Sequence, residues 1–573
     1  MFSKKNLNRN VVLIFVGFIP ILTIASVPFS AAAFMLTAMF ITSSKKCNPK
    51  HLIMYLGSYL ILLNITYALP IPNDNLLLSL YLLLSLIVFG KLFGDFDLGK
   101  TRSDLMFLGL LLFSAAHVLA KQFEKMTELL MNLVFNLGYD QVGHFAIVRT
   151  LGKCSKFLQS CDPNSMSLPL NYMFYPQQWH VLFSRFINNE SMLLALETYL
   201  IALAVSSLIS FYFVSQSFKH FTQQIDGIRF KKYPHLELSK NLMLASIYLL
   251  LTILTILGYP NFVFSLALFV FAVTLCDKRS RASYFLLSIC LIGSISMYTL
   301  FLVPGVLMFV YRTILSRTPL LLKVASVIIW LIFAFSVITI ALEKNHVDFI
   351  GLGGGGISIV VVTIQSILLI GFVLNILQIK HKKIIFPSSD YELFIVNAIL
   401  LASLLGLNAL LLSIGNSSGY YLQKFSYLAF IFGSINLFVT LSRMNVKIPT
   451  PPMTPTSIFL ILALALYLVP RFPFNSPIVN LVNIATGPTT SQKERILNIY
   501  SAAQASELSG KPVVVITNNS GPDTQWANSL SGNWSKELNE YLENKIDNEV
   551  EFRDPDFQAR HKDNFDFYES EKR

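Results

Sequence analysis

The sequence is poor in charged residues. Asp, Glu, Lys and Arg make up 13% of its 573 residues, about half of the roughly 25% found in soluble globular chains. Apolar residues make up 54%, and the mean hydropathy is +0.59. Most surface positions of a water-soluble globule need polar side chains. This scarcity of charge argues against a soluble protein and predicts an all-α polytopic membrane protein.

Several other features are scarce or missing. The chain has 5 cysteines and 9 histidines, with no second Cys or His pair at zinc-ligand spacing. It shows no fixed-period repeat and no heptad array, and the glycine run 353–356 lacks the Lys-Ser/Thr of a phosphate-binding P-loop. The main ionisable residues within apolar runs are His117 and Glu197, and neither forms a pair or relay in the sequence. Ion-coupled transport is therefore disfavoured.

The net charge of +12 is unevenly distributed. Residues 471–573 contain 15 acidic and 11 basic side chains, a charge of −4, so residues 1–470 carry +16. The bases lie in short loops between apolar runs, which is typical of cytoplasmic loops of a membrane protein. A nucleic-acid-binding protein would instead gather them on one soluble face.

Apolar runs long enough to cross a bilayer recur to residue 470, and we expect about 15 spans. We expect the protein to lie in the plasma or inner membrane of the cell. The alternation of basic and non-basic loops places the N-terminus in the cytoplasm and the C-terminus on the extracytoplasmic side. A transmembrane domain over 1–470 then has large outer loops at 121–190 and 343–356. Cys154 and Cys161, in the first loop, could form a local disulfide. The runs lie at 11–41 (expected to hold two short helices), 52–68, 76–93, 104–120, 191–215, 240–258, 262–276, 283–299, 300–313, 320–342, 357–378, 391–413, 425–441 and 456–470.

The last hundred residues differ in composition. A helix-like pattern over 483–509, a strand over 512–517, turn residues at 518–522 and helix-like stretches at 524–530 and 535–545 predict a small extracytoplasmic α/β module over 471–573. We expect its acidic end to be frayed.

The first outer loop contains a candidate catalytic pair. In a helix, Asp140 and His144 are four residues apart and share a face. A carboxylate near an imidazole can act as a general base on a hydroxyl nucleophile. Asp140, His144 and His180 could instead bind a divalent metal ion. The structural alternative is that Asp140 caps a helix and the histidines lie at the membrane surface.

A second candidate group lies late in the chain. Lys424 follows Tyr420 and Tyr421 at the expected outer end of a span. A lysine there opposes the positive-inside bias and suggests an anionic partner such as a lipid-linked phosphate. The alternative is that Lys424 extends to lipid headgroups.

Three stretches together resemble membrane glycosyltransferases of the GT-C fold, in particular arabinofuranosyltransferase-like proteins of actinobacterial envelopes. They are 138–144 (GYDQVGH), 175–180 (YPQQWH) and 419–424 (GYYLQK), with 258–262 (GYPNF) and 298–304 (YTLFLVP) in a similar order. The resemblance covers about residues 100–440.

The resemblance implies transfer of a sugar from a polyprenyl-phosphate donor to a glycan or lipid acceptor on the outer face. Asp140 would activate the acceptor hydroxyl, and His144 and His180 would orient the substrate or assist the carboxylate. The substrates would be held by Arg149, Tyr175, Gln178, His180, Tyr420, Tyr421 and Lys424. Many relatives carry two adjacent acids, whereas Gln141 follows Asp140 here. A lipid-linked saccharide flippase and a polysaccharide polymerase or ligase are the alternative functions.

Overall fold

The structure is a computed structural model of the whole chain. It describes residues 131–132, 135, 141–146, 192–223, 243–244, 247–248, 250–255, 258–275, 281–315, 318–321, 323–328, 330–331, 359–382, 389–413, 420–443, 489–517, 520–533, 538 and 552–569.

The described part of the chain is mostly helical, as predicted. Helices lie where the sequence has long apolar runs, with ends shifted by a few residues, and α10 extends eight residues beyond its predicted run. In chain order they are α10 (Met192–Gln223), α13 (Pro260–Val273), α14 (Arg281–Met297), the 3-10 turn η1 (Thr299–Phe301), α15 (Leu302–Leu315), α18 (Ile359–Lys382), α19 (Ser389–Ser413) and α20 (Tyr420–Arg443). A search of the described residues for a helix with both the length and the apolar character needed to cross a membrane finds none.

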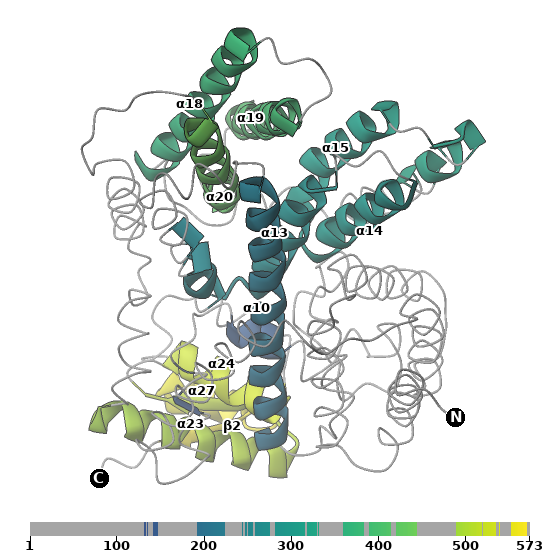
Figure 1. Cartoon of the computed structure of the whole chain (residues 1–573). Coiled ribbons are helices and arrows are strands. Elements are labelled where there is room, and N and C mark those ends of the chain that lie inside the picture. The colour runs from purple at the N-terminus through teal and green to yellow at the C-terminus, as the bar shows by residue number, and fades with distance from the viewer. Residues whose placement is uncertain are drawn as a thin grey trace, which may run out of the picture.

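Helix α10 connects the two main parts of the described fold (Figure 1). Its C-terminal half, including Phe213 and Phe218, lies in a large apolar core with α13, α14, α15 and α20. Its N-terminal half, including Leu196 and Tyr199, belongs to a second core, shared with residues 131–145 and with the C-terminal module. One continuous helix therefore links the helical part of the protein to the module.

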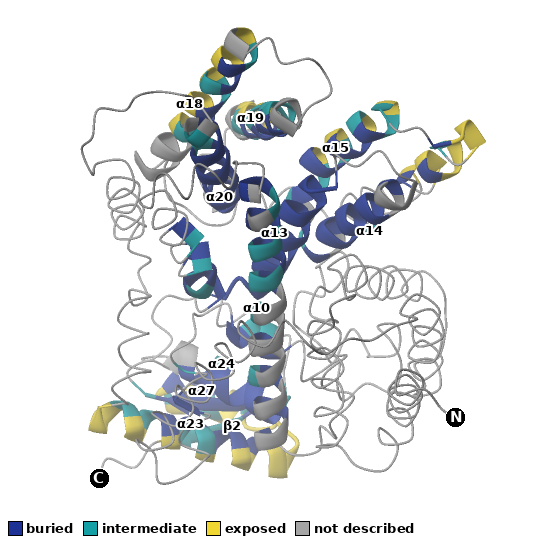
Figure 2. Ribbon diagram, viewed as in Figure 1, coloured by how far each residue is buried: buried dark blue, intermediate teal, exposed yellow. Residues whose placement is uncertain are grey.

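Large apolar side chains lie exposed on the outside of the helical part (Figure 2). They gather on α15, on residues 320–331 and on α18, and their exposed fractions range from 36% to 80%. So many exposed large apolar side chains on three elements are unusual for a soluble monomer. These side chains are Val303, Leu307, Val310, Ile314, Leu320, Leu321, Val324, Val327, Ile328, Leu331, Leu369, Ile370, Val373, Ile376 and Leu377.

Buried amides join α18 to α20. Asn375 donates to Asn436 Oδ1 (3.2 Å), and Asn436 donates to Asn375 Oδ1 (2.8 Å). Asn375 also donates to Thr440 Oγ1 at 2.9 Å. The helices approach closely at Gly433, where a Cβ would lie 3.2 Å from Ile367 Cγ2. Small residues and reciprocal side-chain hydrogen bonds are the means by which helices associate without a hydrophobic driving force.

We expect Asn375→Leu and Asn436→Leu each to lower the free energy of unfolding by about 1 kcal/mol. The double variant should cost little more than either single one, because each single change already removes both hydrogen bonds between the two amides. Unfolding of the purified wild type, the two single variants and the double variant in detergent measures these free energies. Asn408→Leu, at a half-buried position on α19, is the control. Additive effects would contradict the reciprocal pair.

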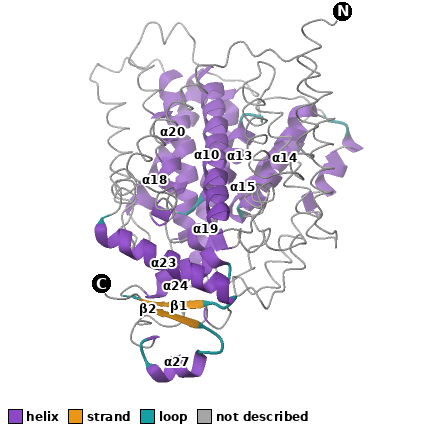
Figure 3. Ribbon diagram, turned by 90° about the horizontal axis from the view of Figure 1, so that it is seen from below, coloured by secondary structure: helices purple, strands orange, loops and turns teal. Residues whose placement is uncertain are grey.

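The C-terminal module is a two-stranded parallel sheet with helices (Figure 3). Strand β1 (Val513–Ile516) is fully buried and pairs with β2 (Asp566–Glu569), Val513 opposite Asp566. Helix α23 (Thr490–Ser509) begins with a capping box, in which Thr489 and Gln492 exchange side-chain and backbone hydrogen bonds, and ends at Gly510 in a left-handed conformation. The buried strand was predicted and is found.

Two details of the module differ from the sequence interpretation. Helix α24 (Ser520–Ser531) begins within the segment read as a turn, since Pro522 lies in its first turn, where proline breaks no helical hydrogen bond. The acidic end, expected to be frayed, contains α27 (Pro555–His561) and β2. Phe557 of α27 and Phe565, directly before β2, are buried with Val514 and Ile516 of β1. This burial explains why the acidic end is folded.

Candidate ligand-binding site

Lys424 lies at the centre of the candidate site. It belongs to the second turn of α20 and is only 5% exposed. Its Nζ donates to the Tyr298 hydroxyl at 2.7 Å and lies 4.1 Å from the ring centroid of Tyr259 and 5.1 Å from that of Tyr298. Both aromatic faces attract the ammonium group. The lysine is thus enclosed by aromatic groups, and it does not extend outward as the headgroup alternative required.

A tight turn positions Tyr259 against the lysine. Gly258 has φ 98°, a conformation that residues with a Cβ rarely adopt. Its amide donates to Thr255 O at 3.2 Å, and the Tyr259 amide donates to Leu254 O at 2.9 Å. Pro260 then begins α13, where it lacks only an N–H that would be unpaired in any case. The sequence Gly-Tyr-Pro therefore sets the direction of the Tyr259 ring.

Tyr298 comes from another helix end. It lies between α14 and η1, and its amide donates to Ser294 O at 3.0 Å. Its ring contacts Phe262 of α13, with centroids 5.4 Å apart. Because an ammonium group can only donate, the Tyr298 oxygen accepts from Lys424 and its own O–H points elsewhere. Lysine and tyrosine together form a positively charged, hydrogen-bond-donating pair.

The helix over 141–146 contacts the same turn. His144 Nε2 lies 3.0 Å from the Gly258 carbonyl oxygen. A carbonyl only accepts, so Nε2 carries the proton in this arrangement and Nδ1 is the basic nitrogen of the neutral ring. His144 and Lys424, 280 positions apart in the chain, therefore meet the Gly258–Tyr259 turn from different elements.

Gln141 fixes this helix in place. Its side chain is fully buried, donates to Thr255 O at 2.7 Å and accepts a hydrogen bond from the Tyr199 hydroxyl of α10. From the sequence, Gln141 stands out only because many GT-C enzymes have a second acid at this position. Its amide supplies both a donor and an acceptor to two buried partners, which a carboxylate could not do.

The predicted site residues are thus placed in part. The structure brings His144 and Lys424 to one turn. Tyr420 and Tyr421 begin α20, one turn before Lys424, and their side chains are outside the described residues. Also outside are Asp140, Arg149, Tyr175, Gln178, His180 and the two cysteines 154 and 161. Sequence reasoning gave no role to Gln141, Tyr259 or Tyr298, although the stretches 258–262 and 298–304 had been singled out.

The metal alternative depends on residues outside the described part. Within the described ranges, no three His, Cys, Asp or Glu side chains come together as metal ligands. Asp140 and His180, which that alternative requires, are not among them.

The C-terminal module packs on the segment that carries His144. Trp526 of α24 contacts Phe135, with ring centroids 5.0 Å apart, and Ser529 Oγ donates to Val142 O at 3.4 Å. Val142 and Phe145 also lie in the core shared with α10 and the module. The module therefore braces the helix whose other contacts reach the Gly258 turn.

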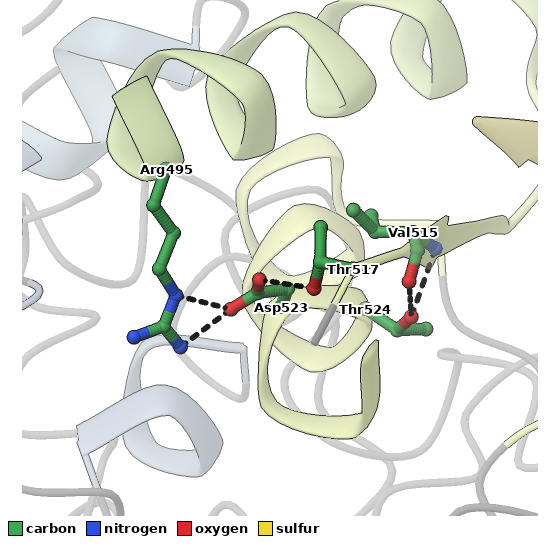
Figure 4. Close-up of polar contacts among 5 residues, drawn as sticks. All are labelled: Arg495, Val515, Thr517, Asp523 and Thr524. Carbon is green, nitrogen blue, oxygen red and sulfur yellow. Dashed lines mark hydrogen bonds and ion pairs between the residues drawn. The ribbon is translucent and has the colours of Figure 1, made fainter. Parts of the chain in front are cut away.

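An ion pair holds the module together (Figure 4). Arg495 of α23 donates to Asp523 Oδ1 from Nε (2.8 Å) and Nη2 (2.5 Å), and Thr517 donates to Asp523 Oδ2 at 2.7 Å. The Asp523 side chain is 0% exposed and that of Arg495 is 40% exposed. Next to it, Thr524 Oγ1 accepts from the Val515 amide at 2.9 Å. These bonds tie α23, α24 and β1 together.

Arg495→Met is expected to loosen the module by about 3 kcal/mol, because it leaves the buried Asp523 carboxylate without its counter-charge. In hydrogen exchange, amides of α24 and β1 should then exchange about a hundredfold faster. Amides of 141–146 should also exchange faster, because the module packs on that helix. Lys493→Met, at an exposed position on α23, is the matched control. Unchanged exchange in Arg495→Met would show that the pair adds nothing to stability.

Comparisons with known proteins give no relative. No protein-family model, curated protein or solved structure matches the chain.

Proposed function

We propose that the protein is an integral membrane glycosyltransferase that transfers a sugar from a polyprenyl-phosphate donor to a glycan or lipid acceptor on the outer face of the cell membrane. The observation that carries the proposal is the buried Lys424 ammonium, enclosed by Tyr259 and Tyr298 at the turn that also binds His144.

Membrane insertion is supported by the outward-facing side chains. The exposed Leu, Ile and Val residues of α15, α18 and 320–331 would be unfavourable in water, at about 25 cal/mol per Å² of apolar surface. Lipid tails would cover them. The reciprocal Asn375–Asn436 pair between α18 and α20 is also typical of helices that associate within a bilayer.

The outer face is supported by the helix ends that meet at the site. Tyr259 precedes α13, Tyr298 follows α14, and Lys424 lies near the start of α20. The charge pattern of the sequence assigns all three ends to the outer side. It assigns the 121–190 loop and the module to that side as well, and the contacts of Trp526 and Ser529 with residues 135 and 142 require these two segments to share a side.

The chemistry follows from the charge of the lysine. Transfer from a polyprenyl-phosphate sugar releases a phosphate group, so negative charge develops on the leaving oxygen. A preorganised ammonium group and a tyrosine O–H in a site shielded from water stabilise such charge strongly. Lys424 and Tyr298 supply this pair, and we assign Tyr420, Tyr421 and Arg149 to the same donor.

The acceptor is assigned to the other side of the turn. Asp140 is next in the sequence to the helical residues 141–146, which include Gln141 and His144, and we assign it the role of general base on the acceptor hydroxyl. Tyr175, Gln178 and His180 are assigned to substrate binding. With Nε2 donating to the Gly258 carbonyl, Nδ1 of His144 can accept a hydrogen bond from a substrate hydroxyl, and we assign His144 to orienting the acceptor.

The direct test offers purified protein in nanodiscs a set of defined polyprenyl-phosphate sugars and follows release of polyprenyl phosphate together with formation of glycosylated acceptor. Transfer from at least one donor is the expected result. Movement of the donor headgroup across the bilayer without transfer would assign the flippase function instead. Joining of preassembled glycan chains would assign a polymerase or ligase.

A further inference from the structure

Arg312 is buried in a way that its own surroundings do not explain. It lies in the last turn of α15 and is 0% exposed. None of its three guanidinium nitrogens has a hydrogen-bond partner among the described residues. A buried, unpaired charge costs several kcal/mol, and buried arginines are normally paired with an anion.

The described neighbours of Arg312 in the chain are apolar or already hydrogen-bonded. Phe309, one turn before Arg312, stacks on Trp330 with ring centroids 4.6 Å apart. The neighbouring Thr313 hydroxyl donates to Phe309 O at 2.8 Å and lies 3.0 Å from the Tyr284 hydroxyl. The C-terminal end of α15 bears a partial negative charge, yet no carbonyl of the described part accepts from the guanidinium.

A second unpaired group lies close by in the chain. Thr318 is 6% exposed, and its Oγ1 has no hydrogen-bond partner in the described residues. It follows the end of α15 by three residues, at the start of the segment 318–331. Arginine and threonine together offer a planar fork of donors and a hydroxyl, the combination that binds phosphate oxygens.

We infer that Arg312, with Thr318, binds a phosphate group at the end of α15 opposite the Lys424 site. The charge pattern places this end on the cytoplasmic side, where the phosphate belongs either to a phospholipid headgroup or to a soluble ion. This site is separate from the proposed transfer reaction, because α15 begins next to Tyr298 and carries Arg312 to its far end.

The experiment compares the full-length wild type with Arg312→Met, which keeps the bulk of the side chain and removes its charge. Thermal unfolding is followed in detergent with inorganic phosphate against chloride at equal ionic strength, and in nanodiscs with phosphatidic acid against phosphatidylcholine. Native mass spectrometry scores phospholipid retained after purification. Lys323→Met, at a half-buried position on 323–328, controls for the loss of one charge at this end.

Phosphate or phosphatidic acid should raise the melting temperature of the wild type and of Lys323→Met. The apparent affinity of Arg312→Met should be at least about tenfold weaker, since hydrogen bonds to charged groups contribute that much. Without the probes, Arg312→Met should be as stable as the wild type or more so. A response to phosphatidic acid alone, with retained phospholipid, assigns the lipid, and a response to inorganic phosphate assigns the soluble ion.

Two results would overturn the inference. One is the absence of any wild-type response to both probes. The other is destabilisation of Arg312→Met without a probe, matched by Asp390→Asn or Glu392→Gln in the first turn of α19, because that pattern assigns Arg312 to an internal ion pair. If Arg312→Met does not fold, Arg312→Lys provides the comparison, since it keeps the charge and loses the planar fork.

Discussion

Lys424→Met is expected to lower the rate of sugar transfer by about 100- to 1000-fold, the usual effect of removing one preorganised donor from a site of developing negative charge. The ammonium group is 5% exposed and enclosed by Tyr259 and Tyr298, so little water is present to replace it. Methionine fits the same space. Single-turnover transfer from a polyprenyl-phosphate sugar measures the effect.

The matched control is Lys380→Met, which removes an exposed lysine of α18 and should leave transfer unchanged. Tyr298→Phe removes only the hydroxyl that accepts from Lys424 and should cost about tenfold, the effect of one hydrogen bond to a charged group. Tyr212→Phe on α10 is its control. Full transfer by a folded Lys424→Met variant would exclude this lysine from donor binding.

Asp140→Asn is the second large effect, an expected loss of about 100- to 10,000-fold in transfer, because an amide cannot accept the acceptor's proton. The loss should appear in the rate constant at saturating acceptor, since asparagine keeps the size of the side chain. Gln141 and His144, which fix the helix directly after Asp140, should maintain the local structure in the variant.

Asp563→Asn makes the same chemical change at an exposed position after α27 and should have no effect. The pH dependence gives an independent measurement. In the wild type, transfer should fall as pH drops through the pKa of the base, and this limb should be missing from the residual activity of Asp140→Asn. An unchanged rate and profile would remove Asp140 from the mechanism and leave the lysine proposal intact.

The site could be predicted from the sequence only where a residue conflicts with its surroundings. Under the topology that the sequence predicts, Lys424 conflicts with the positive-inside bias, and His144 stands out because it lies four positions from an acid. Tyr259, Tyr298 and Gln141 violate no such rule. A tyrosine before a proline or after a helix is common, and its meaning depends on a lysine far away in the chain.

In the C-terminal module, too, the sequence predicts one strand and misses the other. The run Val513–Ile516 predicts a buried strand because four consecutive β-branched residues suit a pleat covered on both faces, and the structure agrees. Its partner β2 is a short segment of two aromatic residues between two acids, Asp566–Glu569, at the end of an acidic stretch. Local composition favours disorder there. The segment is ordered because it pairs with the open edge of β1 and because Phe565 beside it is buried.

By itself, the sequence predicted that apolar helices dominate the described residues and roughly where those helices begin and end, and it singled out Lys424 as an exception to the predicted charge pattern. These are local properties, set by hydropathy and charge over a few turns of helix. The tertiary structure decided which residues come into contact. Lys424 lies against two tyrosines, His144 binds the Gly258 turn, and the module packs on Phe135, Val142 and Phe145. Arg312 has no hydrogen-bond partner among the described residues. Such contacts depend on the packing of distant helices, which no local pattern encodes.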